Sequence, residues 1–256
     1  MSRNSLDSIA RAGLVLVLVT TLGCAAEERP AAEGPEIDEK AAEVLQALTA
    51  KVSAAQHITI RGVETIDAAL ADVVGRSGTA HLAVSVRRPD RFVASMVSED
   101  RERRLFFDGQ TFSILHVKRN FYSSVPMAGD FDHMVSVLAE RFDFSPPVVE
   151  LLLSDSYEYI LRDLESLTYV GEETVGATRS HRISAVEELF AWDLWISVDG
   201  YDLVKLVATA TSLEGRPQVV LEFTEIDLES QLDDALFVFE PPPGARQIRM
   251  VTVDEM

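Results

Sequence analysis

Two blocks of alternating apolar and polar residues constrain the fold of this chain most strongly. The alternation predicts eleven strands, over residues 58–68, 79–88, 91–98, 103–108, 110–118, 121–125, 167–175, 178–186, 190–198, 202–213 and 217–228. Short turns rich in Gly, Pro, Asp and Asn separate most of them, which predicts antiparallel neighbours. A single sheet of about 11 strands must curl or close. We therefore expect a mainly β fold with helices (α+β), in which a curled antiparallel sheet forms an unclosed barrel.

Helical periodicity in other segments predicts the elements that cover this sheet. Residues 37–54 and 130–142 each carry an amphipathic stripe. Ser145-Pro146 is typical of a helix start, and the helix would continue to Leu153. Residues 156–164 fit either a helix or a strand. Because the apolar stripes need cover, we expect the helices on the concave face of the sheet.

Two details of the strand map can be checked individually. Asp108-Gly109 predicts a type I′ hairpin turn, which requires a positive φ that Gly tolerates. Residues 237–244 predict a last short strand, which the prolines at its end would stop.

The first 23 residues have the pattern of an export signal. Arg3 and Arg11 precede a short apolar run, which is shorter than the ~20 residues of a membrane span. The sole cysteine, Cys24, follows this run and resembles the acylated cysteine of a bacterial lipoprotein lipobox, although Thr21 and Leu22 depart from the usual pattern. The alternative is an ordinary secretory signal with an incidental cysteine.

The lipoprotein interpretation defines the domains and the location. Residues 1–23 would be the signal peptide, residues 24–36 a lipid-anchored tether rich in Ala, Glu and Pro, and residues 37–256 a single domain. The protein would lie on the periplasmic side of the bacterial cell envelope. Ala25 after the cysteine favours the outer over the inner membrane, since retained lipoproteins often have Asp there.

Composition excludes some partners and chemistries. The formal net charge of −19 argues against nucleic acid as a partner. The five histidines form no HExxH motif, and no second cysteine is present, so we expect no metal or cofactor. No nucleophile elbow, Walker loop or GxGxxG motif occurs, so we expect no enzyme, although convergent triads can escape detection in a sequence.

An ordered set of short motifs resembles a family of predicted periplasmic proteins, itself similar to the LolA/LolB-like lipoprotein carriers. The set runs along nearly the whole domain: Arg88-Pro89-Asp90-Arg91-Phe92, Phe107-Asp108-Gly109-Gln110-Thr111, Asn120-Phe121-Tyr122, Tyr169 to Gly176, Leu194-Trp195-Ile196 and Phe237-Val238-Phe239-Glu240-Pro241-Pro242. The resemblance implies a half-barrel wrapped over helices, with an apolar cavity for acyl chains and no catalysis. Related folds also serve as envelope-stress sensors, so carrier function is less secure than the fold.

Aromatic and apolar residues in the strands and central helices are the best ligand candidates. Each one alone is more often plain core, and the binding hypothesis depends on the set beneath a lid-like pair of helices. The expected ligand-binding residues are Phe92, Phe112, Tyr122, Phe131, Met134, Leu138, Phe142, Leu152, Trp192 and Trp195.

One basic stretch interrupts the acidic sequence. It comprises Arg87, Arg88, Arg91, Arg101, Arg103 and Arg104. The preferred interpretation is charge that discourages pairing of exposed strand edges. The alternative is a local site for an anionic headgroup.

The sequence leaves three functions open. The first is a non-catalytic envelope lipoprotein that binds an acyl chain, a lipid or a lipidated partner in an apolar cavity. The second is an envelope sensor or structural protein of the same fold, with a filled barrel that binds another protein. The third is an enzyme whose site assembles only in the folded chain.

Overall fold

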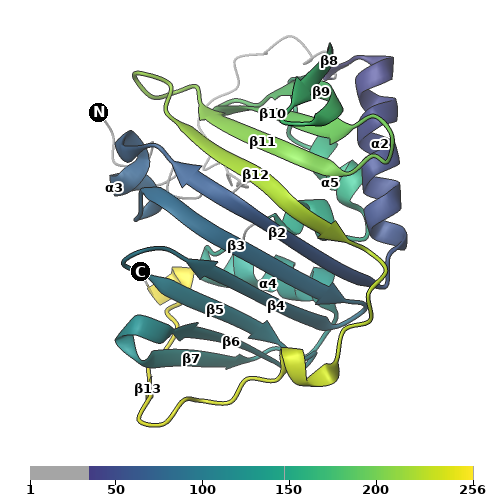
Figure 1. The fold of residues 1–256 in the computed structure, drawn as a ribbon. Helices are drawn as coiled ribbons and strands as arrows, with labels where there is room; N and C mark the ends of the chain where they lie inside the picture. The colour runs from purple at the N-terminus through teal and green to yellow at the C-terminus, as the bar shows by residue number, and fades with distance from the viewer. Residues whose placement is uncertain (1–34, 147, 256) are drawn as a thin grey trace, which may run out of the picture.

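One curved sheet of 13 strands runs through the whole fold (Figure 1). The computed structural model describes residues 35–146 and 148–255. In chain order the strands are β1 (Glu36–Ile37), β2 (His57–Ile66), β3 (Gly78–Arg87), β4 (Arg91–Val97), β5 (Glu102–Phe107), β6 (Thr111–His116), β7 (Phe121–Pro126), β8 (Ser166–Val175), β9 (Thr178–Val186), β10 (Phe190–Ser197), β11 (Leu203–Ala210), β12 (Gln218–Asp227) and β13 (Arg246–Gln247).

Two meanders make up this sheet, β2 to β7 and β8 to β12. They are joined where β12 pairs antiparallel with β2. The sheet does not close into a barrel, because its outermost strands are β1 and β13. The predicted mainly β fold with helices and an unclosed, curled sheet is confirmed. All eleven predicted strands are present as β2 to β12.

The two additional strands were not predicted, and they pair differently. β1 and β13 have two residues each and pair in parallel with β8 and β7. A pattern with a period of two cannot be recognised in two residues. Glu36, predicted to end the tether, lies in β1.

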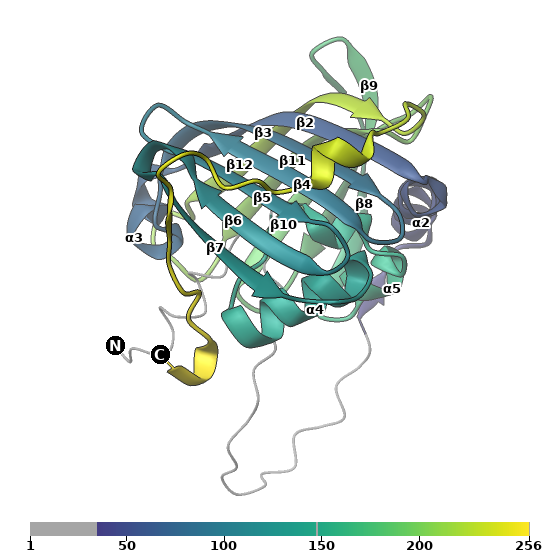
Figure 2. The same cartoon turned by 90° about the horizontal axis from the view of Figure 1, so that it is seen from below.

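The helices lie on the concave side of the sheet and at the ends of its strands. They are α2 (Glu39–Ala54), α3 (Ala71–Val74), α4 (Phe131–Phe142) and α5 (Ser156–Leu161), with 3-10 turns η1 (Ala68–Leu70), η2 (Val117–Arg119), η3 (Val149–Leu152), η4 (Asp234–Phe237) and η5 (Val253–Glu255). Asp38 caps α2 through the Ala41 amide, and Asp130 caps α4 through the His133 amide. Figure 2 shows α4 and α5 beneath the curved sheet, and Figure 1 shows α2 along the strand ends opposite α3.

Three local predictions are corrected by the structure. A helix was expected from Pro146 to Leu153, but only the 3-10 turn η3 forms, because Val148 adopts the left-handed region with φ of 55°. A last strand over 237–244 does not form. At Asp108-Gly109 only Gly109 has a positive φ, so the turn is not type I′. Asp108 instead accepts hydrogen bonds from two amides that follow it.

Residues 229–245 form a C-terminal strap on the convex face of the sheet and lead to β13 at its edge. Figure 2 shows it crossing the face opposite to α4 and α5. Phe237 is 0% exposed and lies beneath the Arg87 guanidinium, and Phe239 packs against Phe106 and Tyr122. This packing explains why 237–244 is not a strand: its aromatic residues cover the sheet instead of extending it.

The core lies on the concave face. Register aligns one apolar row across five strands, with Ile60, Val84, Ala94, Leu105 and Ile114 as successive partners. All five are at most 8% exposed. The apolar stripes of α2 and α4 pack onto this face. None of the helices in the described part of the chain has the length and apolar character needed to cross a membrane.

Candidate functional site

The apolar space between the concave face and the helices brings together most of the predicted ligand residues. Eight of them are at most 8% exposed and belong to one core cluster: Phe92, Phe112, Phe131, Met134, Leu138, Phe142, Leu152 and Trp192. The rings of Phe92 in β4 and Phe131 in α4 lie 5.8 Å apart and join sheet to helix. In this structure these side chains pack against one another.

The other two predicted ligand residues, Tyr122 and Trp195, lie on the convex face. Tyr122 packs against Phe239 of the C-terminal strap, with ring centroids 5.2 Å apart. Trp195 alternates with Leu194 and Ile196 along β10 and so faces away from the core. Its indole donates to Glu173, and the Arg182 guanidinium lies 4.9 Å from the ring. The structure therefore separates these two residues from the other eight.

Residues 130–161, comprising α4, η3 and α5, cover the concave face and are called the lid segment here. Hydrogen bonds from its backbone and to its backbone connect it to the residues that follow β3. The Phe131 amide donates to the Pro89 carbonyl at 2.8 Å. Arg88 donates through Nη2 to the Leu152 carbonyl at 2.7 Å and through Nε to the Ala55 carbonyl at 3.2 Å. Arg88 thus links the end of β3 to both η3 and the end of α2.

Burial affects the protonation of the Arg88 guanidinium. It lowers the pKa of Arg88, which keeps its charge because the starting value is so high. A charged group that bonds two carbonyls is a strong and geometrically specific contact. Arg88 is therefore the residue that we expect to hold the lid segment closed.

The lid segment also carries a buried carboxyl, Glu150. Burial raises its pKa to about 8, although Ser145 donates to Oε1 at 2.8 Å. Neither Glu150 Oε2 nor the Ser156 hydroxyl has a hydrogen-bond partner among the described residues, and both are buried. The polar groups of the lid segment are thus incompletely satisfied, which raises the energy of the closed state.

A second, partly buried carboxyl lies near the first. Burial raises the pKa of Glu187 to about 7, and the Trp192 indole donates to it at 2.9 Å. Its charge also raises the pKa of Glu150. Glu150 was not predicted from the sequence, although a single charge within the apolar run from Val148 to Leu153 was a signal for it.

Among the described residues of the lid segment, two have a left-handed backbone conformation. Asp143 ends α4 with φ of 49°, a common C-cap conformation. Val148 precedes η3 with φ of 55°. A β-branched residue is rare in that region and costs ~1–3 kcal/mol, a strain that functional segments often carry.

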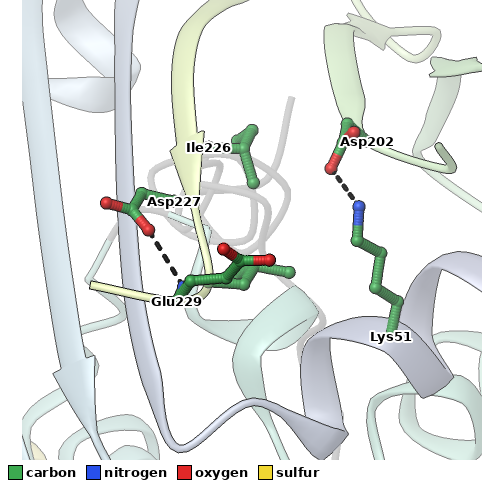
Figure 3. Close-up of a pocket in the computed structure, with 6 residues that line it drawn as sticks. Lys51, Asp202, Ile226, Asp227 and Glu229 are labelled. Atoms are coloured by element: carbon green, nitrogen blue, oxygen red, sulfur yellow. Dashed lines mark hydrogen bonds and ion pairs between the residues drawn. The ribbon is translucent and has the colours of Figure 1, made fainter. Parts of the chain in front are cut away.

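A separate cleft of about 270 Å³ opens beside the end of α2 (Figure 3). Lys51 and Asp202 form an ion pair on one side of it, and Ile226 to Glu229 form the other side. Lys51 also donates to the Gly200 carbonyl at 2.8 Å. The cleft is smaller than the ~300–1,000 Å³ of typical ligand pockets, and the charge of Lys51 in it is already paired with Asp202. None of the ten predicted ligand residues lines it.

Other predicted features lie partly or wholly outside the described residues. The signal peptide 1–23 and Cys24 lie outside them, as does the tether up to residue 34. In the part of the chain that is described, no three His, Cys, Asp or Glu side chains are grouped to hold a metal ion.

Comparison with known proteins identifies the family. A family described as "Predicted periplasmic protein (DUF2092)" matches residues 41–251, and the chain belongs to this family. The predicted resemblance to a family of periplasmic proteins is thereby confirmed, and it supports a location in the periplasm. The sequence matches none of the curated proteins with which it was compared.

Several solved structures are similar in fold. An uncharacterized conserved protein from Thermus thermophilus has a TM-score of 0.50 at 10% identity, over 82% of this chain and 99% of that one. Lipoprotein LppX from Mycobacterium tuberculosis has a TM-score of 0.47 at 14% identity, over 77% and 100%. A chain of the Pseudomonas aeruginosa MucA/MucB complex has 0.45 at 14%, over 78% and 61%. At such identities the likeness concerns the fold alone.

Proposed function

We propose that this periplasmic protein is a non-catalytic binding protein that takes an acyl chain of a lipid or lipoprotein between its sheet and its lid segment. The observation that carries the proposal is the continuous apolar concave face, covered by one connected segment that lies between the two meanders. Eight predicted ligand side chains lie at this boundary. The structure then corresponds to the closed state, in which the lid segment occupies the place of the ligand.

Exchange of the lid segment for an acyl chain is energetically reasonable. Opening exposes apolar side chains such as Met134 and Leu138, which costs free energy. An entering chain offsets that cost by ~0.8 kcal/mol for each buried methylene. The unsatisfied Glu150 and Ser156 oxygens gain water on opening, which lowers the cost further. The mechanism needs no covalent step and no cofactor.

Binding of a fluorescent fatty acyl probe tests this function. We expect saturable binding by the wild type and faster probe association by Arg88→Met, because the variant loses the contacts to the Leu152 and Ala55 carbonyls. Arg61→Met is the matched control, since Arg61 pairs with Glu225 on the exposed face. Absence of saturable binding in all three proteins would overturn the proposal.

We also propose that the protein is tied to the outer membrane by lipid on Cys24. The support is the export signal before this cysteine and Ala25 after it. Two or more acyl chains anchor stably, whereas one does not. Cys24→Ser should appear in the soluble periplasmic fraction. If it stays with the membranes in high salt, the anchor is not this cysteine.

A second function, an envelope sensor that binds another protein, is favoured by one observation. The predicted ligand side chains pack against one another, as in a filled barrel. The same probe experiment separates the two functions, because a filled barrel would bind no acyl probe in either the wild type or Arg88→Met.

A further inference from the structure

An arginine projects from the concave face near the end of the sheet that carries α3. Register across the strands makes Leu82, Met96, Arg103, His116 and Phe121 successive partners in one row. Leu82 belongs to the core and Met96 packs against it, so the row is on the concave side. Figure 1 shows the end of β4 and the start of β5 at the same end of the sheet as α3. Arg103 thus continues the apolar face toward the end of the sheet that carries α3.

The guanidinium of Arg103 is not neutralised by the described residues. Its Nε is buried and has no hydrogen-bond partner among them. The charges that act on it come from Arg101, Arg76 and Arg119, all of which are cationic. Together with burial they lower its pKa to about 10. A cation that is largely buried normally has a carboxylate partner, and none of the described residues supplies one to Nε of Arg103.

Three acidic groups near this end already have other partners. Glu64 is bound to Arg76, and Glu102 to Arg104 on the convex face. Asp100, in the turn between β4 and β5, accepts from the Ser98 hydroxyl at 2.8 Å. The positive potential around Arg103 therefore persists in a chain whose net charge is −19.

The positive potential around Arg103 also acts on the pKa of His116. Its ring packs on Phe121, with centroids 4.4 Å apart. Burial lowers its pKa to about 4, and Arg103, Arg119 and Arg101 contribute to the decrease in that order of effect. A neighbouring anion would reverse the part of the shift that comes from the arginines.

We propose that Arg103, Arg101 and Arg119 form a binding site for a phosphate or carboxylate group at this end of the concave face. Guanidinium groups match both anions with paired N–H donors. The anion could belong to the headgroup of an amphiphile whose chain enters the apolar face, an assignment that rests on the proposed function. It could also be a free phosphate, which needs no acyl chain.

Nuclear magnetic resonance of the full-length protein tests the anion site with inorganic phosphate as the probe. We expect phosphate at constant ionic strength to shift the Arg103 Nε–H resonance saturably and to raise the pKa of His116. Arg103→Met should weaken this effect about tenfold or more. Arg119→Met should weaken it less, and this exposed residue tests the site even if Arg103→Met fails to fold. Arg61→Met is the control and should bind as the wild type does.

Short-chain phosphatidylglycerol and phosphatidylcholine, below their micelle concentrations, distinguish the sources of the anion. Tighter binding of phosphatidylglycerol than of phosphate, lost in Arg119→Met, supports the headgroup. Binding of phosphate without tighter binding of phosphatidylglycerol supports a free anion as the ligand. The proposed anion site then stands even if the acyl proposal fails. The proposal of an anion site is overturned if the wild type and Arg119→Met bind both lipids equally well and neither responds to phosphate. The acyl proposal would stand in that case.

Discussion

At the scale of one residue, Glu150 shows that the lid segment is not a purely apolar cover of the sheet, because it buries a carboxyl group. Its neighbours Val149 and Leu151 are buried, and so is its own carboxyl. The sequence pattern predicted one more apolar helix here, because periodicity does not register the cost of burying a carboxyl. The consequence is a carboxyl whose pKa burial raises to about 8 and one of whose oxygens is unpaired among the described residues.

We predict that stability falls as pH rises through the range in which Glu150 is protonated only in the folded state. Its ordinary pKa is 4.5 and its folded value is about 8, so the folded state binds more protons between these values. The effect is at most about 1.4 kcal/mol per pH unit for one group, and Glu187 adds to it up to pH 7. Glu150→Gln should flatten the fall measured by denaturant unfolding. Exposed Glu158→Gln should leave it as in the wild type, and an equal fall in all three proteins would contradict the assignment.

Gly109 gives a second prediction at this scale. Its φ is +83°, and an added Cβ would lie 2.6 Å from Asp90 Oδ2 and 2.8 Å from Arg91 Nη1. Gly109→Val should therefore lower the free energy of unfolding by more than ~1 kcal/mol. Gly215→Val is the control, since Gly215 has a φ of +78° but no described atom within 4 Å of an added Cβ. Equal losses in both variants would mean that only backbone strain matters at Gly109.

At the scale of the elements, strands with a regular pattern were predictable and the lid segment was only partly so. The alternation over β2 to β12 reflects one buried and one exposed face, a local property that the sequence records. Residues 130–142 were predicted as a helix and form α4 over Phe131–Phe142. The helix expected up to Leu153 was wrong because its apolar run buries residues on all sides, and periodicity cannot then distinguish a helix from a 3-10 turn.

We predict that loss of the α4 cap loosens the lid segment. Asp130→Ala removes the hydrogen bond from the His133 amide and should cost ~0.5–2 kcal/mol. It should also speed uptake of a fluorescent acyl probe, because α4 opens more often. Asp38→Ala removes the equivalent cap of α2 and is the matched control. If both variants change uptake equally, opening is not confined to the lid segment.

At the scale of the whole molecule, pairings between distant segments could not be predicted from the sequence. The pairing of β12 with β2 joins residues more than 150 positions apart, and no local pattern specifies it. The position of the C-terminal strap is also set by distant partners, Phe106 and Tyr122 for Phe239. For the same reason, Tyr122 and Trp195 were predicted together with ligand residues that lie on the opposite face.

The strap yields a prediction about the whole fold. Phe237 is 0% exposed on the convex face, so Phe237→Ala should lower the free energy of unfolding by ~3–5 kcal/mol. Neighbouring Val238 is 51% exposed, and Val238→Ala should change it little. Denaturant unfolding measures both. Equal stability of the two variants would show that packing of the strap does not stabilise the fold.

Hydrogen exchange of the lid segment, with and without a fatty acyl ligand, tests the central claim most directly. The account predicts that the α4 amides exchange faster than those of α2 in the free protein, since opening is local. Saturating ligand should change exchange in α4, η3 and α5 while the amides of β3 and β4 remain protected. Exchange in α4 as slow as in α2, and unaltered by ligand, would contradict an opening lid and favour the filled barrel.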